Sequence, residues 1–336
     1  MKKLSLFLLT ALLLLVLAAC GTDGESEEAS GAVDEGEAEE EAAEENEKAE
    51  AEEASEITVT HELGETVVPK NPESVVVFDF GVLDTLDTLG VEGITGIPQG
   101  GKVPEYLSEY AGEEYENVGT LVEADFETVH ALDPELIIIS GRQSDNYDEF
   151  SSIAPTIYSG VDTGRYVESF EENVEVLAEI FEKEAEAEEA LAEVHQSIEA
   201  LNEDATADDG KSLVVLANEG SVSAYGPSSR YGMIHDNFGF EPVDENIESS
   251  THGQSISYEY ISENNPDYMF VIDRGAAVGD GDESSLTNVI ENELVQTTEA
   301  YKNDKILYLD PEFWYLSGGG LTSVQEMVNE AAQMLE

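Results

Sequence analysis

The chain has 336 residues, of which 76 are acidic and 13 are basic, so its formal net charge is −63. This length suits one or two domains, and the 41% of residues that are hydrophobic are enough for a real core. Such acidity argues against nucleic acid or an anionic membrane surface as a partner, and the single cysteine excludes an intramolecular disulfide.

The sequence pattern at the N-terminus predicts a targeting segment. Two lysines precede an apolar run at residues 4–17, which has the length of a signal-peptide core and is short for a membrane span. The run ends in Leu17-Ala18-Ala19-Cys20, a pattern that resembles the bacterial lipobox. We therefore expect residues 1–20 to be a signal peptide and Cys20 to carry a lipid that anchors the chain to the membrane. The alternative is a plain secretory peptide whose cysteine is incidental.

Residues 21–56 have the composition of a tether. They contain almost only Glu, Asp, Ala, Gly and Ser, and no aromatic residue. Such a segment cannot bury enough apolar surface to offset the entropy lost on ordering, so we expect it to be disordered. Its expected role is to hold a folded body away from the lipid.

From Ile57 onward the pattern is typical of an α/β fold. Short apolar runs at residues 75–78, 136–139, 213–216 and 269–272 alternate with helical stretches. Continuous apolar strands between helices indicate sheets that are covered on both faces.

A sequence repeat divides this region into two lobes. In each copy an aromatic-Glu pair is followed by a turn with proline, an apolar strand and an arginine. Corresponding residues lie 132 positions apart, and they are Glu127, Pro134 and Arg142 in the first copy and Glu259, Pro266 and Arg274 in the second. We expect an N-terminal lobe at residues 57–168 and a C-terminal lobe at residues 206–336.

The segment between the lobes, residues 169–205, predicts one long amphipathic helix. Its apolar residues are spaced by three and four positions, and no Pro or Gly interrupts it before Asn202. Two lobes joined by one helix would form a stiff clamp with limited hinge bending. The alternative is an ordinary crossover helix inside a single domain.

The chain contains only four arginines, Arg142, Arg165, Arg230 and Arg274. Ligands of α/β proteins bind at the carboxyl ends of strands, and three of the arginines follow apolar strands directly or after a short turn. Arg142 and Arg274 occupy equivalent places in the repeat, so they could face each other across a cleft. Guanidinium groups suit carboxylates and other anionic oxygens. The alternative is that each arginine pairs with a surface carboxylate, which is our reading for Arg165.

Two further segments could contact a ligand. His252 lies in a polar loop, where it could reach a bound metal centre or simply be solvated. Trp314 and Tyr315 precede three consecutive glycines and could pack on a ligand or cap the core. The phosphate-binding lysine of a Walker loop is missing and no G-x-S-x-G elbow occurs, so support for an enzyme is weak.

Together these features resemble the siderophore-binding lipoproteins of Gram-positive ABC importers, nearest to their petrobactin-binding (catecholate) branch. The resemblance runs from about Ile57 to the C-terminus. The stretches that carry it are residues 77–81, 139–144, 229–235, 250–255, 271–275 and 314–320. It implies a periplasmic-binding-protein-like fold with a helical backbone, in which the ligand binds between the two lobes.

The resemblance also implies roles for individual residues. Arg142, Arg230 and Arg274 would form a cationic triad around a ferric catecholate centre. His252 and Tyr315 would complete the iron coordination when the siderophore supplies only four donors. Glu127 and Glu259, one in each lobe, would dock onto arginines of the permease dimer.

The expected protein is thus a monomeric binding protein without a cofactor, anchored on the outer face of the cell membrane. Its expected partners are a ferric siderophore, an ABC permease dimer and the ATPase of that permease. Alternatives on the same architecture are binding of haem, a cobalamin, a hydroxamate siderophore or ferric citrate. An extracellular metal-dependent hydrolase that uses His252 is the alternative of a different class. The extreme acidity departs from the family, so the cleft must supply its own positive potential.

Overall fold

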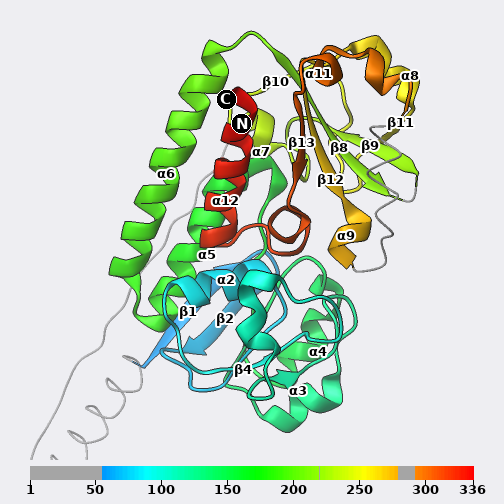
Figure 1. Ribbon diagram of the computed structural model, residues 1–336. Coiled ribbons are helices and arrows are strands. Elements are labelled where there is room, and N and C mark those ends of the chain that lie inside the picture. Colours follow the sequence, from blue (N-terminus) through cyan, green and yellow to red (C-terminus); the bar gives the residue numbers. More distant parts are fainter. Residues whose placement is uncertain (1–54, 219, 279–291) are drawn as a thin grey trace, which may run out of the picture. The chain divides into compact units, whose positions relative to one another are not determined.

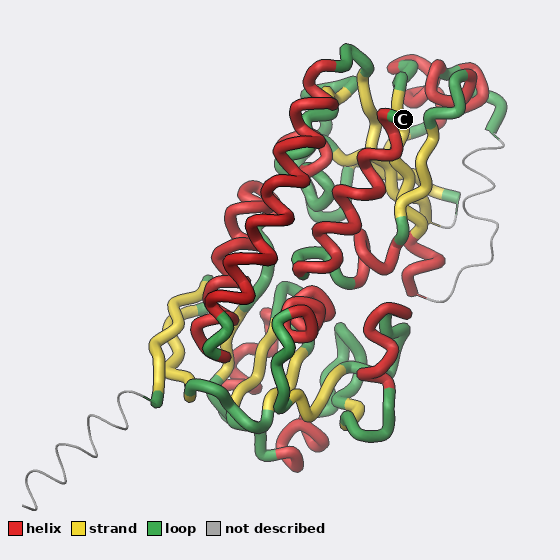
Figure 2. The backbone as a smooth tube through the Cα atoms, turned by 60° about the vertical axis from the view of Figure 1, so that its left-hand side comes forward, coloured by secondary structure: helices red, strands yellow, loops and turns green. Residues whose placement is uncertain are grey.

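The computed structural model describes residues 55–218, 220–278 and 292–336, all of which fall in the unit Glu50–Glu336. The predicted signal peptide with Cys20, and the tether as far as residue 54, lie outside the described residues. The first strand begins at Glu56, one residue before the expected start of the N-terminal lobe. Two larger sheets follow, which Figure 2 shows as separate groups of yellow strands.

The N-terminal lobe is built on a parallel five-stranded sheet in the order β5-β4-β3-β6-β7. In the strand β3, Val75 and Val77 enter one apolar cluster and Val76 enters another, so the sheet is covered on both faces as predicted. The strands are β1 (Glu56–His61), β2 (Gly64–Pro69), β3 (Val75–Val77), β4 (Ile94–Ile97), β5 (Glu116–Asn117), β6 (Leu136–Ile139) and β7 (Thr156–Tyr158); β1 and β2 form an antiparallel hairpin. The helices are α2 (Phe80–Thr88), α3 (Phe126–Leu132) and α4 (Tyr147–Ser151), with short helices η1 (Glu105–Ala111), η2 (Ser144–Asn146) and η3 (Thr163–Arg165).

The C-terminal lobe contains a mixed six-stranded sheet in the order β11-β9-β8-β12-β13, with β10 beside β8. In β12, Met269 and Val271 enter one apolar cluster while Phe270 and Ile272 enter another, so this sheet is also covered on both faces. The strands are β8 (Lys211–Asn218), β9 (Ser221–Tyr225), β10 (Glu241–Pro242), β11 (Gln254–Ile256), β12 (Tyr268–Asp273) and β13 (Ile306–Leu309). The helices are α7 (Met233–Asp236), α8 (Tyr258–Asn264), α9 (Arg274–Val278), α11 (Glu299–Lys302) and α12 (Leu321–Ala332), with short helices η4 (Val295–Thr297), η5 (Glu312–Leu316) and η6 (Gln333–Leu335).

The repeat inferred from the sequence is also a structural repeat. The helices α3 and α8 both have 7 residues, and their N-caps, Asp125 and Ser257, lie 132 positions apart. Their C-caps, Asp133 and Asn265, are both left-handed, with φ of 47° and 45°. A strand in the interior of its sheet follows each helix, β6 in one lobe and β12 in the other.

The prediction of one continuous helix over residues 169–205 is wrong. The segment forms two helices, α5 (Tyr166–Phe181) and α6 (Glu184–Ala207), which turn at Glu182 in a left-handed conformation with φ of 54°. The helices run antiparallel, because His195 on α6 contacts Glu171 on α5 at 2.6 Å. The turn brings the first part of the α5 stripe, Phe170 and Val174, into one cluster with the apolar stripe of α6, which a straight helix could not do. Leu177 and Phe181 of α5 instead join an apolar cluster of the N-terminal lobe. The longer arm of this hairpin, α6, is labelled in Figure 1.

The last helix, α12, connects parts of the molecule that are far apart in the sequence. It packs against α6 on one side and against α2 of the N-terminal lobe on another. Both contacts bury apolar residues of α12, among them Leu321, Val324 and Met327. Within the described residues, every helix is too short or too polar to span a membrane.

Candidate functional site

The N-terminal lobe contributes Arg142, which follows strand β6. Its Nη1 lies 3.9 Å from Oδ2 of Asp79, which directly follows the apolar run that contains β3. Ser140 donates a hydrogen bond to the same Oδ2 atom, and the other carboxylate oxygen caps helix α2. The two strand ends therefore place a guanidinium group beside a carboxylate that the backbone already holds in position.

The C-terminal lobe contributes Arg230 and Arg274. Arg274 is the first residue of α9 and directly follows β12, whereas Arg230 lies in the loop between β9 and α7. The guanidinium carbon of Arg230 lies 4.2 Å from the centre of the Tyr315 ring and 5.3 Å from that of Tyr231, within the range of cation–π contacts.

These three arginines meet at a single residue, Tyr315. Its backbone carbonyl oxygen accepts hydrogen bonds from Nη2 of Arg142 at 2.7 Å and from Nη2 of Arg230 at 3.0 Å. Its hydroxyl oxygen accepts a hydrogen bond from Nε of Arg274 at 3.1 Å. The arginines thus converge from both lobes, as their place at strand ends suggested; their contact with a ligand stays a prediction.

A cavity of about 1100 Å³ opens at this meeting point. Its walls come from both lobes and include Arg142, Arg230, His252 and Tyr315. Arg274 is not among the residues that line the cavity, and it reaches the site through the Tyr315 hydroxyl. The cavity can therefore present two guanidinium groups directly to a ligand, while the third acts from behind Tyr315.

The charges at the site perturb one another. Burial lowers the pKa of Arg142, the charge of Asp79 raises it, and the nearby charge of Arg230 lowers it further. Burial also lowers the pKa of Arg230, but the interactions with Tyr231 and Tyr315 outweigh the effect of burial, so the pKa of Arg230 is raised. Burial alone would raise the pKa of Tyr315, yet the hydrogen bond from Arg274 and the charges of Arg230 and Arg274 bring it below 10.0. The site therefore favours anionic oxygen.

Arg165 also lies at the rim of the cavity, but carboxylates already hold it. Its Nε is 2.8 Å from Glu168 and its Nη2 is 2.7 Å from Glu172. Both partners are on the neighbouring helix α5 and all three side chains are largely exposed. The expectation of a surface ion pair for this arginine is confirmed.

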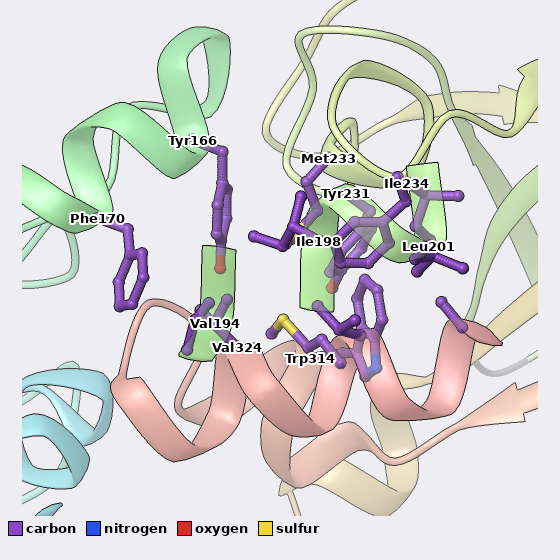
Figure 3. Close-up of a cluster of buried hydrophobic side chains, with 14 of the residues drawn as sticks. Tyr166, Phe170, Val194, Ile198, Leu201, Tyr231, Met233, Ile234, Trp314 and Val324 are labelled. Atoms are coloured by element: carbon purple, nitrogen blue, oxygen red, sulfur yellow. The ribbon is translucent and has the colours of Figure 1, made fainter. Parts of the chain in front are cut away.

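Trp314 belongs mainly to the core. Only 3% of it is exposed, and its indole N–H donates to the Glu330 carboxylate at 2.7 Å. Figure 3 shows it among buried apolar side chains. Its ring also meets that of Phe238 edge to face. Part of the residue still lines the cavity, so its contact with a ligand stays a prediction, with little area available for it.

The remaining predicted residues lie as follows. His252 is exposed in a turn that lines the cavity, so its position is compatible with a ligand contact. Among the described residues, no group of three or more His, Cys, Asp and Glu is arranged to hold a metal ion. Glu127 and Glu259 are both exposed at the second position of their helices, α3 and α8, away from the cavity lining.

Two residues of the site were missed by reasoning from the sequence. Asp79 directly follows an apolar strand, which is the same signal that identified Arg142. It did not stand out, because acidic residues are common in this chain and arginines are rare. Asn218, at the end of β8, accepts a hydrogen bond from Nη1 of Arg274 at 3.4 Å. Its role depends on the pairing of β8 with β12, which the sequence does not reveal.

Similar proteins are known. The family described as periplasmic binding protein matches residues 75–313. The petrobactin-binding protein YclQ of Bacillus subtilis (strain 168) is 48% identical over 339 residues, which cover 100% of both chains. The ferric-anguibactin-binding protein FatB of Vibrio anguillarum is 33% identical over 82% of this chain and 86% of its own length. The crystal structure of YclQ matches with a TM-score of 0.81 and 52% identity, and covers 84% of this chain and 99% of that chain.

Proposed function

Because the chain belongs to the periplasmic binding protein family, we propose that it captures a ferric siderophore between its lobes and delivers it to an ABC importer. The observation that carries this proposal is the convergence of Arg142, Arg230 and Arg274 on Tyr315 at the edge of a large cavity. Such a constellation suits a bulky anion that presents several oxygen atoms.

The electrostatics explain why a ferric catecholate would bind here. A ferric complex of catecholate or mixed catecholate-citrate type is large, anionic and partly aromatic. Arginines at a partly dry site attract such a complex much more strongly than they would in water. The names of YclQ and FatB support a siderophore, and that of YclQ supports a petrobactin-like one.

The geometry supports individual roles for these residues. Arg142 and Arg230 line the cavity and would contact the chelate directly, in competition with the Tyr315 carbonyl. Arg274 would act mainly through the Tyr315 hydroxyl, whose lowered pKa favours the charged oxygen that a ferric ion prefers. His252 and Tyr315 would complete the coordination of iron only with a tetradentate siderophore.

The remaining parts of the proposal concern the cell. A lipid on Cys20 would hold a monomeric protein on the outer face of the membrane. Glu127 and Glu259 would dock onto the permease dimer, whose ATPase drives uptake. In this role the protein binds and releases an intact chelate and performs no chemistry on it, in keeping with the binding proteins that it resembles.

A binding titration tests the proposal. Trp314 is the only tryptophan and lies in the turn that carries Tyr315, so its emission should be quenched as ferric siderophore is added. We expect saturable one-to-one binding, and Arg142→Ala, Arg230→Ala and Arg274→Ala should each weaken it at least about tenfold.

The matched control is Arg165→Ala. Arg165 lies at the rim of the cavity but is held by Glu168 and Glu172, so its loss should leave the affinity unchanged. Ferric hydroxamate, ferric citrate, haem and cobalamin serve as competing ligands in the same assay. Unchanged affinity in all three site variants would contradict the assignment of the arginines. Tight binding of one of the competing ligands alone would change the ligand class.

A further inference from the structure

The Tyr315 carbonyl, which accepts from Arg142 and Arg230, belongs to a short helical turn of unusual geometry. The turn η5 (Glu312–Leu316) is π-helical, and the carbonyl of Glu312 accepts from both the N–H of Ser317 at 3.0 Å and its hydroxyl at 2.7 Å. π-Helical turns are rare and cluster at functional sites. Any change in the position of this turn would move the acceptor that holds Arg142 and Arg230.

The outer side of the turn is held by the N-terminal lobe. One carboxylate oxygen of Glu312 lies 2.8 Å from Nζ of Lys102, and the other accepts the backbone N–H of Glu105 at 2.6 Å. The Glu312 side chain is only 14% exposed, so this pair is better shielded than an ordinary surface pair. Next to it, the rings of Phe313 and Tyr106 pack with their centres 5.0 Å apart and their planes tilted by 43°.

Lys102 also touches the second element that carries a site residue. Its Nζ donates to the carbonyl of Ala276 at 3.3 Å, two residues after Arg274 in helix α9. A single ammonium group from the N-terminal lobe thus contacts both the turn of Tyr315 and the helix of Arg274. Neither Lys102 nor Glu312 lines the cavity.

We propose that Lys102 and Glu312 are a positioning pair for the ligand site. The pair fixes the π-helical turn and helix α9 against the N-terminal lobe, so that Arg142, Arg230 and Arg274 stay assembled around Tyr315. The physical need is clear, because two guanidinium groups that share one carbonyl repel each other and drift apart if that carbonyl moves. This inference rests on the proposed function, since its effect is read through ligand binding.

The test compares four variants in the ferric-siderophore titration. Lys102→Met keeps the aliphatic stem but removes the charge, and Glu312→Gln keeps the shape but removes the partner charge. Each should weaken binding about three- to tenfold, with a change in the emission of Trp314 in the ligand-free protein. The double variant should bind ferric siderophore no more weakly than the weaker of the two single variants, because the two residues act as a unit. Lys102→Arg should restore most of the affinity.

Lys211→Met is the control, because Nζ of Lys211 lies 2.9 Å from Glu241 in an exposed ion pair of similar length that touches no site residue. It should bind like the unaltered protein. Unaltered affinity of Lys102→Met, additive losses in the double variant, or a loss that Lys102→Arg does not restore would each overturn the inference. Failure of the unaltered protein to bind would instead overturn the proposed function, so the two failures are distinguishable.

Discussion

At the scale of single residues, the site depends on a main-chain atom. Arg142 and Arg230 donate to the same carbonyl oxygen of Tyr315, which brings two positive charges close together. Asp79 offsets only part of this repulsion, because its carboxylate is 3.9 Å from the nearest guanidinium nitrogen. The excess positive charge is what an anionic chelate would neutralise, so the ligand-free arrangement is already organised for it.

Another residue, His235, leads us to expect that stability depends on pH. Its Nδ1 lies 2.9 Å from the Phe240 carbonyl and 3.4 Å from the Ser212 hydroxyl, and its Nε2 lies 3.3 Å from the Tyr225 carbonyl. Burial holds its pKa below 6.5, although the two carbonyl contacts and the charge of Asp236 oppose the shift. The unfolded chain therefore takes up this proton at a higher pH than the folded protein does.

We therefore expect the contribution of His235 to be complete above pH 6.5 and to be lost as the pH falls below that value. His235→Gln should reduce the loss of stability between about pH 7 and pH 5. The measurement is the free energy of unfolding in denaturant at several pH values for both proteins. His61, whose pKa burial also lowers, contributes equally to both and cancels in the difference. Parallel pH curves would contradict this prediction.

At the scale of elements, one helix caps another across the molecule. Asp84 on α2 accepts the N–H groups of Thr322 at 3.0 Å and Ser323 at 2.7 Å, the first turn of α12. Asp84 is 1% exposed, and burial raises its pKa against the effect of these hydrogen bonds. Gly320 must lack a side chain, because a Cβ there would collide with the Asp84 carboxylate. The N-terminal lobe thereby holds the helix that follows the ligand-site turn.

Asp84→Ala should lower the free energy of unfolding by about 2 kcal/mol, since it leaves the buried N–H of Ser323 and the half-buried N–H of Thr322 without their acceptor. Asp125→Ala is the comparison, because Asp125 caps α3 at an exposed position and its loss should cost clearly less. Chemical denaturation of both variants measures the difference. An equal or smaller cost for Asp84 would mean that this cap contributes nothing beyond an ordinary one.

At the scale of the whole molecule, a strongly negative body would carry a cationic site and two matching docking residues. Glu127 and Glu259 occupy the same position in the two copies of the repeat, on helices of equal length. Each is exposed near a helix N-terminus, where a carboxylate is favourable in any case. Their equivalence is what a permease with two similar halves would recognise.

Replacing both Glu127 and Glu259 by Lys should leave ferric-siderophore binding unchanged and abolish uptake by cells. The matched control is Glu123→Lys with Glu263→Lys, which makes the same change in charge at exposed positions near the same helices. Uptake of radioactive iron and the fluorescence titration measure the two effects. Normal uptake by the first double variant, or an equal loss in the control, would argue against docking by these glutamates.

Much of this fold could be predicted from local sequence patterns. The apolar runs became interior strands of both sheets, and the repeat of Glu127 and Glu259 became two equivalent helices with equivalent caps. The break at Glu182 was missed, because a left-handed Glu has no signal as plain as Gly or Pro. The break lets apolar residues of both helices enter one cluster, a tertiary contact that no local pattern encodes.

By itself the sequence determined four interior strands, the two lobes and the scarcity of arginines, because these depend on residue types and on spacings of a few positions. Only the tertiary structure decided that Arg142 meets a carbonyl 173 positions away, and that Lys102 meets Glu312. Such contacts depend on how whole elements pack, and no short-range pattern encodes the distance between two loops. A main-chain acceptor also leaves no mark in the sequence, because every residue has the same carbonyl group.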